Sequence, residues 1–157
     1  MKAIITGVTG QDGSHLTDLL LEKGYEVVGV SRRTSTDNTE RIKHVLDHPN
    51  FTLESGDIAD SSSLVRILEN HGHGLQVEFY NLAAQSHVAE SFKQPGVTWD
   101  ITGKGVLNAL QSIVDLDLKH IRFYQASSSE MFGSSFDYKT YNLNTGEIEQ
   151  YQDEGTK

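Results

Sequence analysis

Ser128 and Glu130 are the residues of this chain that could perform acid-base chemistry together. They lie in the segment YQASSSEMFG, at the end of a strand-like run over residues 121–126. A serine hydroxyl can hydrogen-bond a sugar oxygen, and a partly desolvated carboxylate can act as acid or base near neutral pH. The two side chains point the same way if the strand continues to residue 130. A serine-rich helix start would explain the same residues without any chemistry.

Three glycines, Gly7, Gly10 and Gly13, follow the first strand-like run in the segment IITGVTGQDGSHL. A glycine-rich turn between a strand and a helix lets backbone N–H groups approach a pyrophosphate, whose charge is favoured by the helix N-terminus. The succession of strand, turn and helix therefore predicts a dinucleotide site. The alternative is a tight turn that binds nothing.

The end of the second strand indicates which dinucleotide would bind. The sequence there is VSRRTS, so Arg32, Arg33, Thr34 and Ser35 stand where a fold that prefers NAD usually has an acidic residue. Arginine can grip a 2'-phosphate through two hydrogen bonds, whereas a carboxylate would repel it. We therefore expect NADP as the cofactor. An ordinary pair of solvated arginines is the alternative.

The third and fourth strands end in further candidate site residues. Asp57, followed by Ile58, lies where an adenine ring would rest. Two alanines at 83–84 would let the backbone pass close to a cofactor. Ser86 and His87 would project from the carboxyl ends of the strands, where ligands bind in such sheets. His87 could equally be a rim histidine without a role.

These candidates need a scaffold, and the apolar pattern predicts one. Strand-like runs over residues 3–6, 26–30, 51–54, 77–82 and 121–126 alternate with segments of helical spacing near residues 16–23, 42–46, 64–68 and 106–114. Strands joined by helices imply right-handed crossovers and a parallel sheet covered on both faces. We predict an α/β fold, a doubly wound parallel sheet of the Rossmann type with five strands.

The character of the sequence changes after Gly133. Residues 134–157 are polar with scattered aromatics and have no traceable helical period. Asn144 and Gly146 supply turn dihedrals for a small hairpin, and a mobile tail is the alternative. We expect a dinucleotide-binding domain over residues 1–133 and a polar tail or insertion over residues 134–157.

Composition excludes several classes of function. The chain has 157 residues, a formal net charge of −9 and no cysteine. An acidic surface argues against nucleic-acid binding, and the lack of cysteine excludes disulfides and thiolate metal sites. His71 and His73 have no third ligand at a matching spacing, so we interpret them as loop residues and expect no metal. Without a signal peptide or a membrane-length apolar run, we expect a soluble cytoplasmic protein.

Six segments together resemble the GDP-mannose 4,6-dehydratases of the extended short-chain dehydrogenase/reductase superfamily. They are GVTGQDGSHL, LEKGYEVVGVSRRTS, NTERIKH, GDI, YNLAAQSHVAESF and RFYQASSSEMFG, all within residues 1–133. The pair Gln11 and Asp12, the two arginines and the run SHV make the resemblance more specific than the glycines alone. It implies an NADP site formed by Gly7, Thr9, Gly10, Gln11, Asp12, Gly13, Arg32, Arg33, Thr34, Ser35, Asp57, Ile58, Leu82, Ala83, Ala84, Gln85 and Ser86.

The resemblance also implies an activity. Such an enzyme oxidises C4 of GDP-mannose, eliminates water across C5 and C6 and returns the hydride to C6, so that NADP is regenerated in every cycle. Glu130 would act as the acid/base that removes the C5 proton. Ser128 would contact the sugar where the family usually has Thr, and Ser86 and His87 would complete the substrate site. The product would lead toward GDP-fucose, and family members form homo-oligomers.

The chain departs from the family in further ways. Val97 stands where a Tyr is common, and no tyrosine is followed four residues later by the lysine that would lower its pKa. The chain also ends before a sixth strand and the region that holds the nucleotide sugar. We therefore expect the N-terminal part of a longer enzyme, or a truncated relative, that binds NADP with little or no turnover. A non-catalytic NADP-binding module and an epimerase or reductase of another nucleotide sugar are the alternatives.

Overall fold

The computed structural model describes residues 1–128, 138–141 and 148–151. They belong to two units, Met1–Ala126 and Ser127–Lys157. The first unit holds a five-stranded sheet in the order β3-β2-β1-β4-β5, and every pair of neighbouring strands is parallel. Its strands are β1 (Lys2–Thr6), β2 (Glu26–Ser31), β3 (Phe51–Ser55), β4 (Val77–Asn81) and β5 (Arg122–Gln125). The predicted doubly wound parallel sheet is confirmed.

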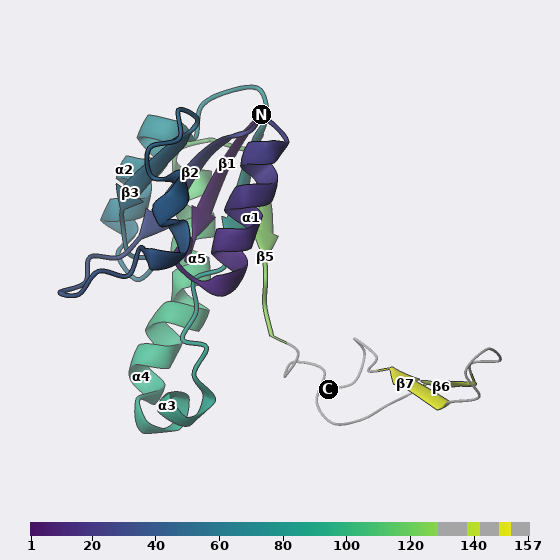
Figure 1. Ribbon diagram of the computed structural model, residues 1–157. Coiled ribbons are helices and arrows are strands. Elements are labelled where there is room, and N and C mark those ends of the chain that lie inside the picture. Colours follow the sequence, from purple (N-terminus) through teal and green to yellow (C-terminus); the bar gives the residue numbers. More distant parts are fainter. Residues whose placement is uncertain (129–137, 142–147, 152–157) are drawn as a thin grey trace. The chain divides into compact units, whose positions relative to one another are not determined.

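Helices cover both faces of the sheet (Figure 1). On one face lie α1 (Gln11–Glu22) and the short 3₁₀ helix η1 (Glu40–Val45). On the other lie α2 (Ser61–His71) and α5 (Gly105–Asp115). Between β4 and α5 the chain forms α3 (Val88–Lys93), α4 (Pro95–Thr98) and the π-helical segment η2 (Trp99–Lys104).

Alternation along the central strands divides the core into two layers. Ile5 and Val27 pack with α1, whereas Ile4 and Phe79 pack with α2 and α5. Successive strand residues point to opposite faces, and β1 is buried on both, which explains its continuous apolar run. The ring of Phe79 stacks on that of Phe123 with centroids 5.4 Å apart, which joins β4 to the edge strand β5.

Two of the expected helices differ from the structure. The segment near residues 42–46 forms only the six-residue 3₁₀ helix η1, because Pro49 disfavours helical backbone at His48 just after it. Helix α1 begins at Gln11, so the residues from Gln11 to Gly13 form its first turn rather than the loop before it. The helical segments over residues 88–104 had no expected counterpart.

The second unit contains an antiparallel pair of strands, β6 (Tyr138–Tyr141) and β7 (Ile148–Tyr151), in which Tyr138 is opposite Tyr151. The boundary between the units, at Ala126, lies seven residues before the boundary expected at Gly133 (133 − 126). Among the described residues, no helix is long and apolar enough to cross a membrane.

Candidate dinucleotide site

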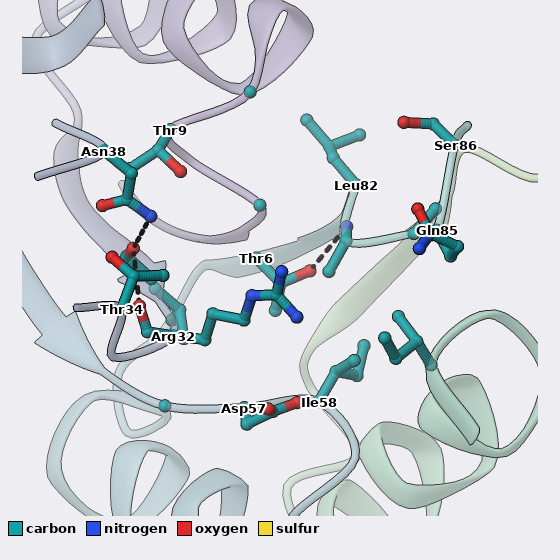
Figure 2. A pocket seen from close by; sticks show the side chains of 18 residues that line it. Thr6, Thr9, Arg32, Thr34, Asn38, Asp57, Ile58, Leu82, Gln85 and Ser86 are labelled. Atoms are coloured by element: carbon teal, nitrogen blue, oxygen red, sulfur yellow. Dashed lines mark hydrogen bonds between the residues drawn. The ribbon is translucent and has the colours of Figure 1, made fainter. Parts of the chain in front are cut away.

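A cavity of about 390 Å³ opens at the carboxyl ends of β1 to β4. The strand order reverses between β1 and β4, which is where open α/β sheets bind their ligands. Loops after four strands and one residue of η2 surround it (Figure 2). The lining residues are Thr6, Gly7, Thr9, Gly10, Val30, Ser31, Arg32, Thr34, Asn38, Gly56, Asp57, Ile58, Leu82, Ala83, Ala84, Gln85, Ser86 and Ile101.

The turn after β1 has no room for side chains at two of its glycines. Gly7 has φ of +70°, and a Cβ there would lie 2.9 Å from the backbone nitrogen of Ala83. A Cβ at Gly13 would collide with the carbonyl oxygen of Gly7. The N–H of Gly10 donates to that same oxygen at 2.9 Å, which closes the turn. Backbone is therefore the surface that this turn presents to the cavity.

Helix α1 begins at the cavity with unpaired donors. Its N-cap, Gly10, has no side chain to cap it, and Ser14 is the first residue whose N–H bonds back, to the Gly10 carbonyl at 3.0 Å. Within the described residues, the N–H groups of residues 11–13 have no hydrogen-bond acceptor. Such groups carry the positive end of the helix dipole and suit an anion.

The last residue of β2 and the loop after it, residues 31–39, are together called here the outer loop. Arg32 is exposed, lines the cavity and forms no ion pair with any described residue. Figure 2 shows its side chain extended into the cavity. Arg33 and Ser35 line a neighbouring hollow that also contains Arg32 and Thr34. The four predicted 2'-phosphate residues thus gather around two adjoining depressions.

The side-chain hydrogen bonds of the outer loop join residues of the loop to one another in the described part of the chain. The Thr34 hydroxyl donates to the carbonyl of Thr36 at 2.5 Å, and Asn38 donates to the Ser31 hydroxyl at 3.4 Å. A third interaction joins the hydroxyl and N–H of Thr39 to the carboxylate of residue 37. These Thr39 hydrogen bonds hold the pKa of Asp37 below its ordinary value.

The loop after β4, residues 82–86, is called the inner loop, and a buried polar network holds it. The N–H of Ala83 donates to the Thr6 hydroxyl at 3.3 Å, and that hydroxyl donates to Asn81 Oδ1 at 2.6 Å. Asn81 Nδ2 donates to Gln125 Oε1 at 2.7 Å. Because Thr6 and Asn81 are buried, these bonds fix the carboxyl ends of β1, β4 and β5 to one another.

The loop after β3 forms the far wall. Ile58 is buried, and the Asp57 carboxylate accepts the N–H of Ala59 at 2.9 Å. The N–H of Asp57 donates to the Ser63 hydroxyl at 3.0 Å, which ties the loop to α2. One carboxylate oxygen is therefore engaged within the loop, while Asp57 itself lines the cavity.

Most of the predicted cofactor residues meet at this cavity. Five do not line it: Gln11, Asp12 and Gly13 lie in the first turn of α1, and Arg33 and Ser35 line the neighbouring hollow. Sequence reasoning did not single out Thr6, Asn38 and Ile101 as lining residues. Thr6 ends an apolar strand and Ile101 lies on an unexpected helix, so neither carried a signal that distinguished it from core.

The predicted catalytic residues do not belong to the first unit. Ser128 is an exposed residue of the second unit, and Glu130 lies outside the described residues. His87 is exposed and precedes α3, where its side chain caps no backbone group. The acid-base pair of Ser128 and Glu130 remains a prediction.

Tyr80 and Tyr25 are not suited to act as a base at neutral pH. Tyr80 donates its hydroxyl to Glu78 at 2.8 Å, and burial together with that carboxylate raises the pKa of Tyr80 to about 12. Burial, and then the charge of Glu78, also raises the pKa of Tyr25. A base at neutral pH needs the opposite shift.

The histidine segment HGHG requires a correction. His71 is the last residue of α2, not a loop residue, and its Nε2 lies 2.9 Å from Glu54 Oε1. The apolar spacing over residues 64–68 did not reveal that α2 continues to residue 71. Among the described residues, no group of three or more His, Asp or Glu side chains could hold a metal ion.

Comparisons with known proteins show which family the chain resembles in sequence. The sequence model of the GDP-mannose 4,6-dehydratase family matches residues 4–145. A GDP-mannose 4,6-dehydratase of Vibrio cholerae is 51% identical over 138 residues, and that of Homo sapiens is 46% identical over 138 residues. These alignments cover 84% and 83% of this chain but 36% of each relative, so the chain spans about a third of their length.

Solved structures share the fold. A UDP-glucose 4-epimerase of Thermotoga maritima superposes with a TM-score of 0.71 and 26% identity, over 96% of this chain and 45% of that one. A UDP-glucose 4-epimerase of Stenotrophomonas maltophila, solved with bound NAD, gives 0.70 and 26%, over 88% and 40%.

Proposed function

The chain belongs to the GDP-mannose 4,6-dehydratase family, and from this premise we propose that its cavity binds NADP for the dehydration of GDP-mannose. One observation carries the proposal: Gly7, Gly10 and Arg32 line the cavity at the switch point of the sheet, and α1, whose first N–H groups are unpaired among the described residues, begins directly after Gly10. Backbone donors suit a pyrophosphate, and an unpaired guanidinium suits a further phosphate.

Each part of the cavity has a part of the cofactor to hold. The turn from Gly7 to Gly13 and the start of α1 would hold the pyrophosphate, and the outer loop with its two arginines would hold the 2'-phosphate. Asp57 and Ile58 would border the adenine, which leaves the inner loop for the nicotinamide half. The epimerase of Stenotrophomonas maltophila, which shares this fold, was solved with NAD. Bound NADP would supply a hydride acceptor and donor.

The residues for the sugar follow from the same proposal. Once C4 has become a ketone through the redox chemistry that bound NADP would supply, the Glu130 carboxylate would take the C5 proton while the C6 hydroxyl leaves as water. Return of the hydride to C6 and of a proton to C5 would then complete GDP-4-keto-6-deoxymannose. The Ser128 hydroxyl would hydrogen-bond the sugar, and Ser86 and His87 would be further substrate-binding residues. Assembly into homo-oligomers, a cytoplasmic location and a product used for GDP-fucose stay predictions at this point.

Cofactor titration tests the binding half of the proposal. We expect the purified chain to bind NADP more tightly than NAD, and Arg32→Glu to weaken NADP about 100-fold while NAD changes less than threefold, because a carboxylate repels the 2'-phosphate. Arg122→Glu, the same charge change at the amino end of β5, is the matched control. Equal losses for both dinucleotides would contradict the assignment of Arg32.

Mass spectrometry tests the chemical half. The chain with NADP is incubated with GDP-mannose, dTDP-glucose or UDP-N-acetylglucosamine, and loss of water is followed. We expect NADP binding with little or no turnover from these 157 residues, and slow loss of water from GDP-mannose alone in any preparation that turns over. Water lost equally from another nucleotide sugar would contradict the proposed substrate.

A further inference from the structure

One continuous helical run contacts two of the loops that border the cavity. Helices α4, η2 and α5 follow one another without a break from Pro95 to Asp115. This run, called here the brace, bonds to the loop after β3 and to the inner loop. A π-helical segment such as η2 is uncommon and is found frequently at functional sites.

Asn108 fixes the brace to the loop after β3. Its Nδ2 donates to the carbonyl oxygens of Ile58 at 3.0 Å and Ala59 at 3.2 Å, in a partly buried position. Next to it, a Cβ at Gly105 would lie 2.9 Å from Ile58 Cγ2, so the helix approaches the loop closely. The two hydrogen bonds of Asn108 and the close approach at Gly105 thus fix the position of Ile58 relative to α5. Ile58 lines the cavity.

Thr102 fixes the other end of the brace to the inner loop. The N–H of Gln85 donates to the Thr102 hydroxyl at 3.2 Å. The neighbouring Ile101 lines the cavity together with Gln85. Because Thr102 is exposed, water competes for this single bond, and we expect it to matter less than the two bonds of Asn108.

We infer that Asn108 and Thr102 are positioning residues, through which the brace sets the separation of the two loops and so the affinity of the cavity for its dinucleotide. The inference rests on the proposed function, because its ligand is NADP. Both side chains bond to backbone atoms of cavity residues rather than to the cavity itself. They act through those residues, and their effect is on binding geometry.

Exchange of amide for carboxylate tests Asn108. Asn108→Asp keeps the shape but sets oxygen against the two carbonyls, and we expect NADPH to bind about tenfold more weakly, with faster hydrogen exchange at the amides of Ala59 and Asp60. Gln111→Glu is the matched control on the same helix, since the Gln111 amide donates only to Asp115 at 2.7 Å on an exposed surface. Asn108→Ala removes the donor without adding charge and replaces the first variant if it fails to fold.

A rescue pair tests Thr102. Thr102→Val removes the acceptor, and we expect about threefold weaker NADPH binding with faster exchange of the Gln85 amide. Thr102→Ser keeps the hydroxyl and restores both values. Thr98→Val is the control, because the Thr98 hydroxyl donates to the carbonyl of Gln94 within the same helical stretch.

The outcomes separate this inference from the proposed function. If the unchanged chain binds NADPH and Asn108→Asp binds it as Gln111→Glu does, the inference is overturned and the proposed function stands. If the unchanged chain binds no dinucleotide, the proposed function fails and this inference, which concerns affinity for NADP, fails with it. Slow hydrogen exchange of the Ala59 and Gln85 amides in every variant would mean that the brace does not hold the two loops, and would overturn the inference.

Discussion

The outer and inner loops lie on opposite sides of one cavity, yet different kinds of contact hold them. The side-chain hydrogen bonds of the outer loop join its own residues, such as Thr34 to Thr36. Hydrogen bonds of Thr6 and Asn81 connect the inner loop to three strands. Thr6 and Ala83 are 77 residues apart in the sequence, and Asn81 and Gln125 are 44 residues apart. The rest of the fold therefore orders the inner loop and leaves the outer loop to order itself.

This difference separates stability from specificity within one site. A change in the inner loop disturbs the sheet as well as the ligand, because the same atoms serve both. The outer loop carries Arg32 and Arg33, and the sheet does not depend on the side chain of either. Under the proposed function, selection between NADP and NAD would therefore change in the outer loop at little cost in folding free energy.

The largest effect is expected where the glycine turn touches the inner loop. Gly7→Ala places a Cβ 2.9 Å from Leu82 and Ala83 backbone at φ +70°, and we expect it to lower the free energy of unfolding by about 3 kcal/mol. Gly24→Ala is the matched control, since Gly24 has φ +76° with open space around it, and should lose about 1 kcal/mol. Equal losses in urea unfolding would mean that backbone conformation alone requires Gly7.

The next effect compares one asparagine from each loop region. Asn81→Leu removes the bonds to Thr6 and Gln125 at a position with no solvent exposure, and we expect a loss of about 2 kcal/mol in unfolding free energy. Asn38→Leu removes one long, partly buried bond of 3.4 Å in the outer loop and should lose less than about 0.5 kcal/mol. Similar losses from the two variants would remove the contrast between the loops.

The smallest effect on the free energy of unfolding is expected at β3, the strand beside the hollow of the outer loop. Glu54 on β3 accepts from His71 and from Arg66, each at 2.9 Å, and these hydrogen bonds hold the pKa of Glu54 below its ordinary value. A lowered carboxyl pKa stabilises the fold above the unfolded pKa, and that stability is lost as pH falls through the folded one.

Glu54→Gln tests this dependence in urea unfolding at two pH values. We expect the variant to be less stable by about 1 kcal/mol at pH 7, and the difference to disappear well below the ordinary glutamate pKa of about 4.3. Glu69→Gln, at an exposed position of α2 without a hydrogen bond in the described part of the chain, is the control. A difference that persists at low pH would assign the effect to packing.

Much of the sheet could be predicted from the sequence because its signals are local. Each expected strand lies within one residue of the observed bounds at either end, since burial on both faces requires a run of apolar residues such as those of β1. The glycines at 7, 10 and 13 were equally visible, because a residue without a side chain is a local property. Most residues predicted for the cofactor therefore line the cavity, and their binding role stays a prediction.

The parts that could not be predicted depend on partners far along the chain. Thr6 gives no sign in sequence that its hydroxyl meets Asn81, 75 residues away. Asn108 lies on an expected helix, but its contact with Ile58 depends on how α5 packs against the loop after β3. The helical segments before α5 lack a regular apolar period, and the exposure of Phe92 and Trp99 explains why.

The central place of β1 has a consequence for the order in which the sheet assembles. Lys2 pairs with Glu26, 24 residues away (26 − 2), and with Val77, 75 residues away (77 − 2). Closing the longer loop costs about 1 kcal/mol more in chain entropy. We expect pulse-labelled refolding to protect the amides of β2 before those of β4. In a newly made chain, β1 would thus pair only with β2 until β4 leaves the ribosome. During that time the unpaired edge of β1 would be open to other chains.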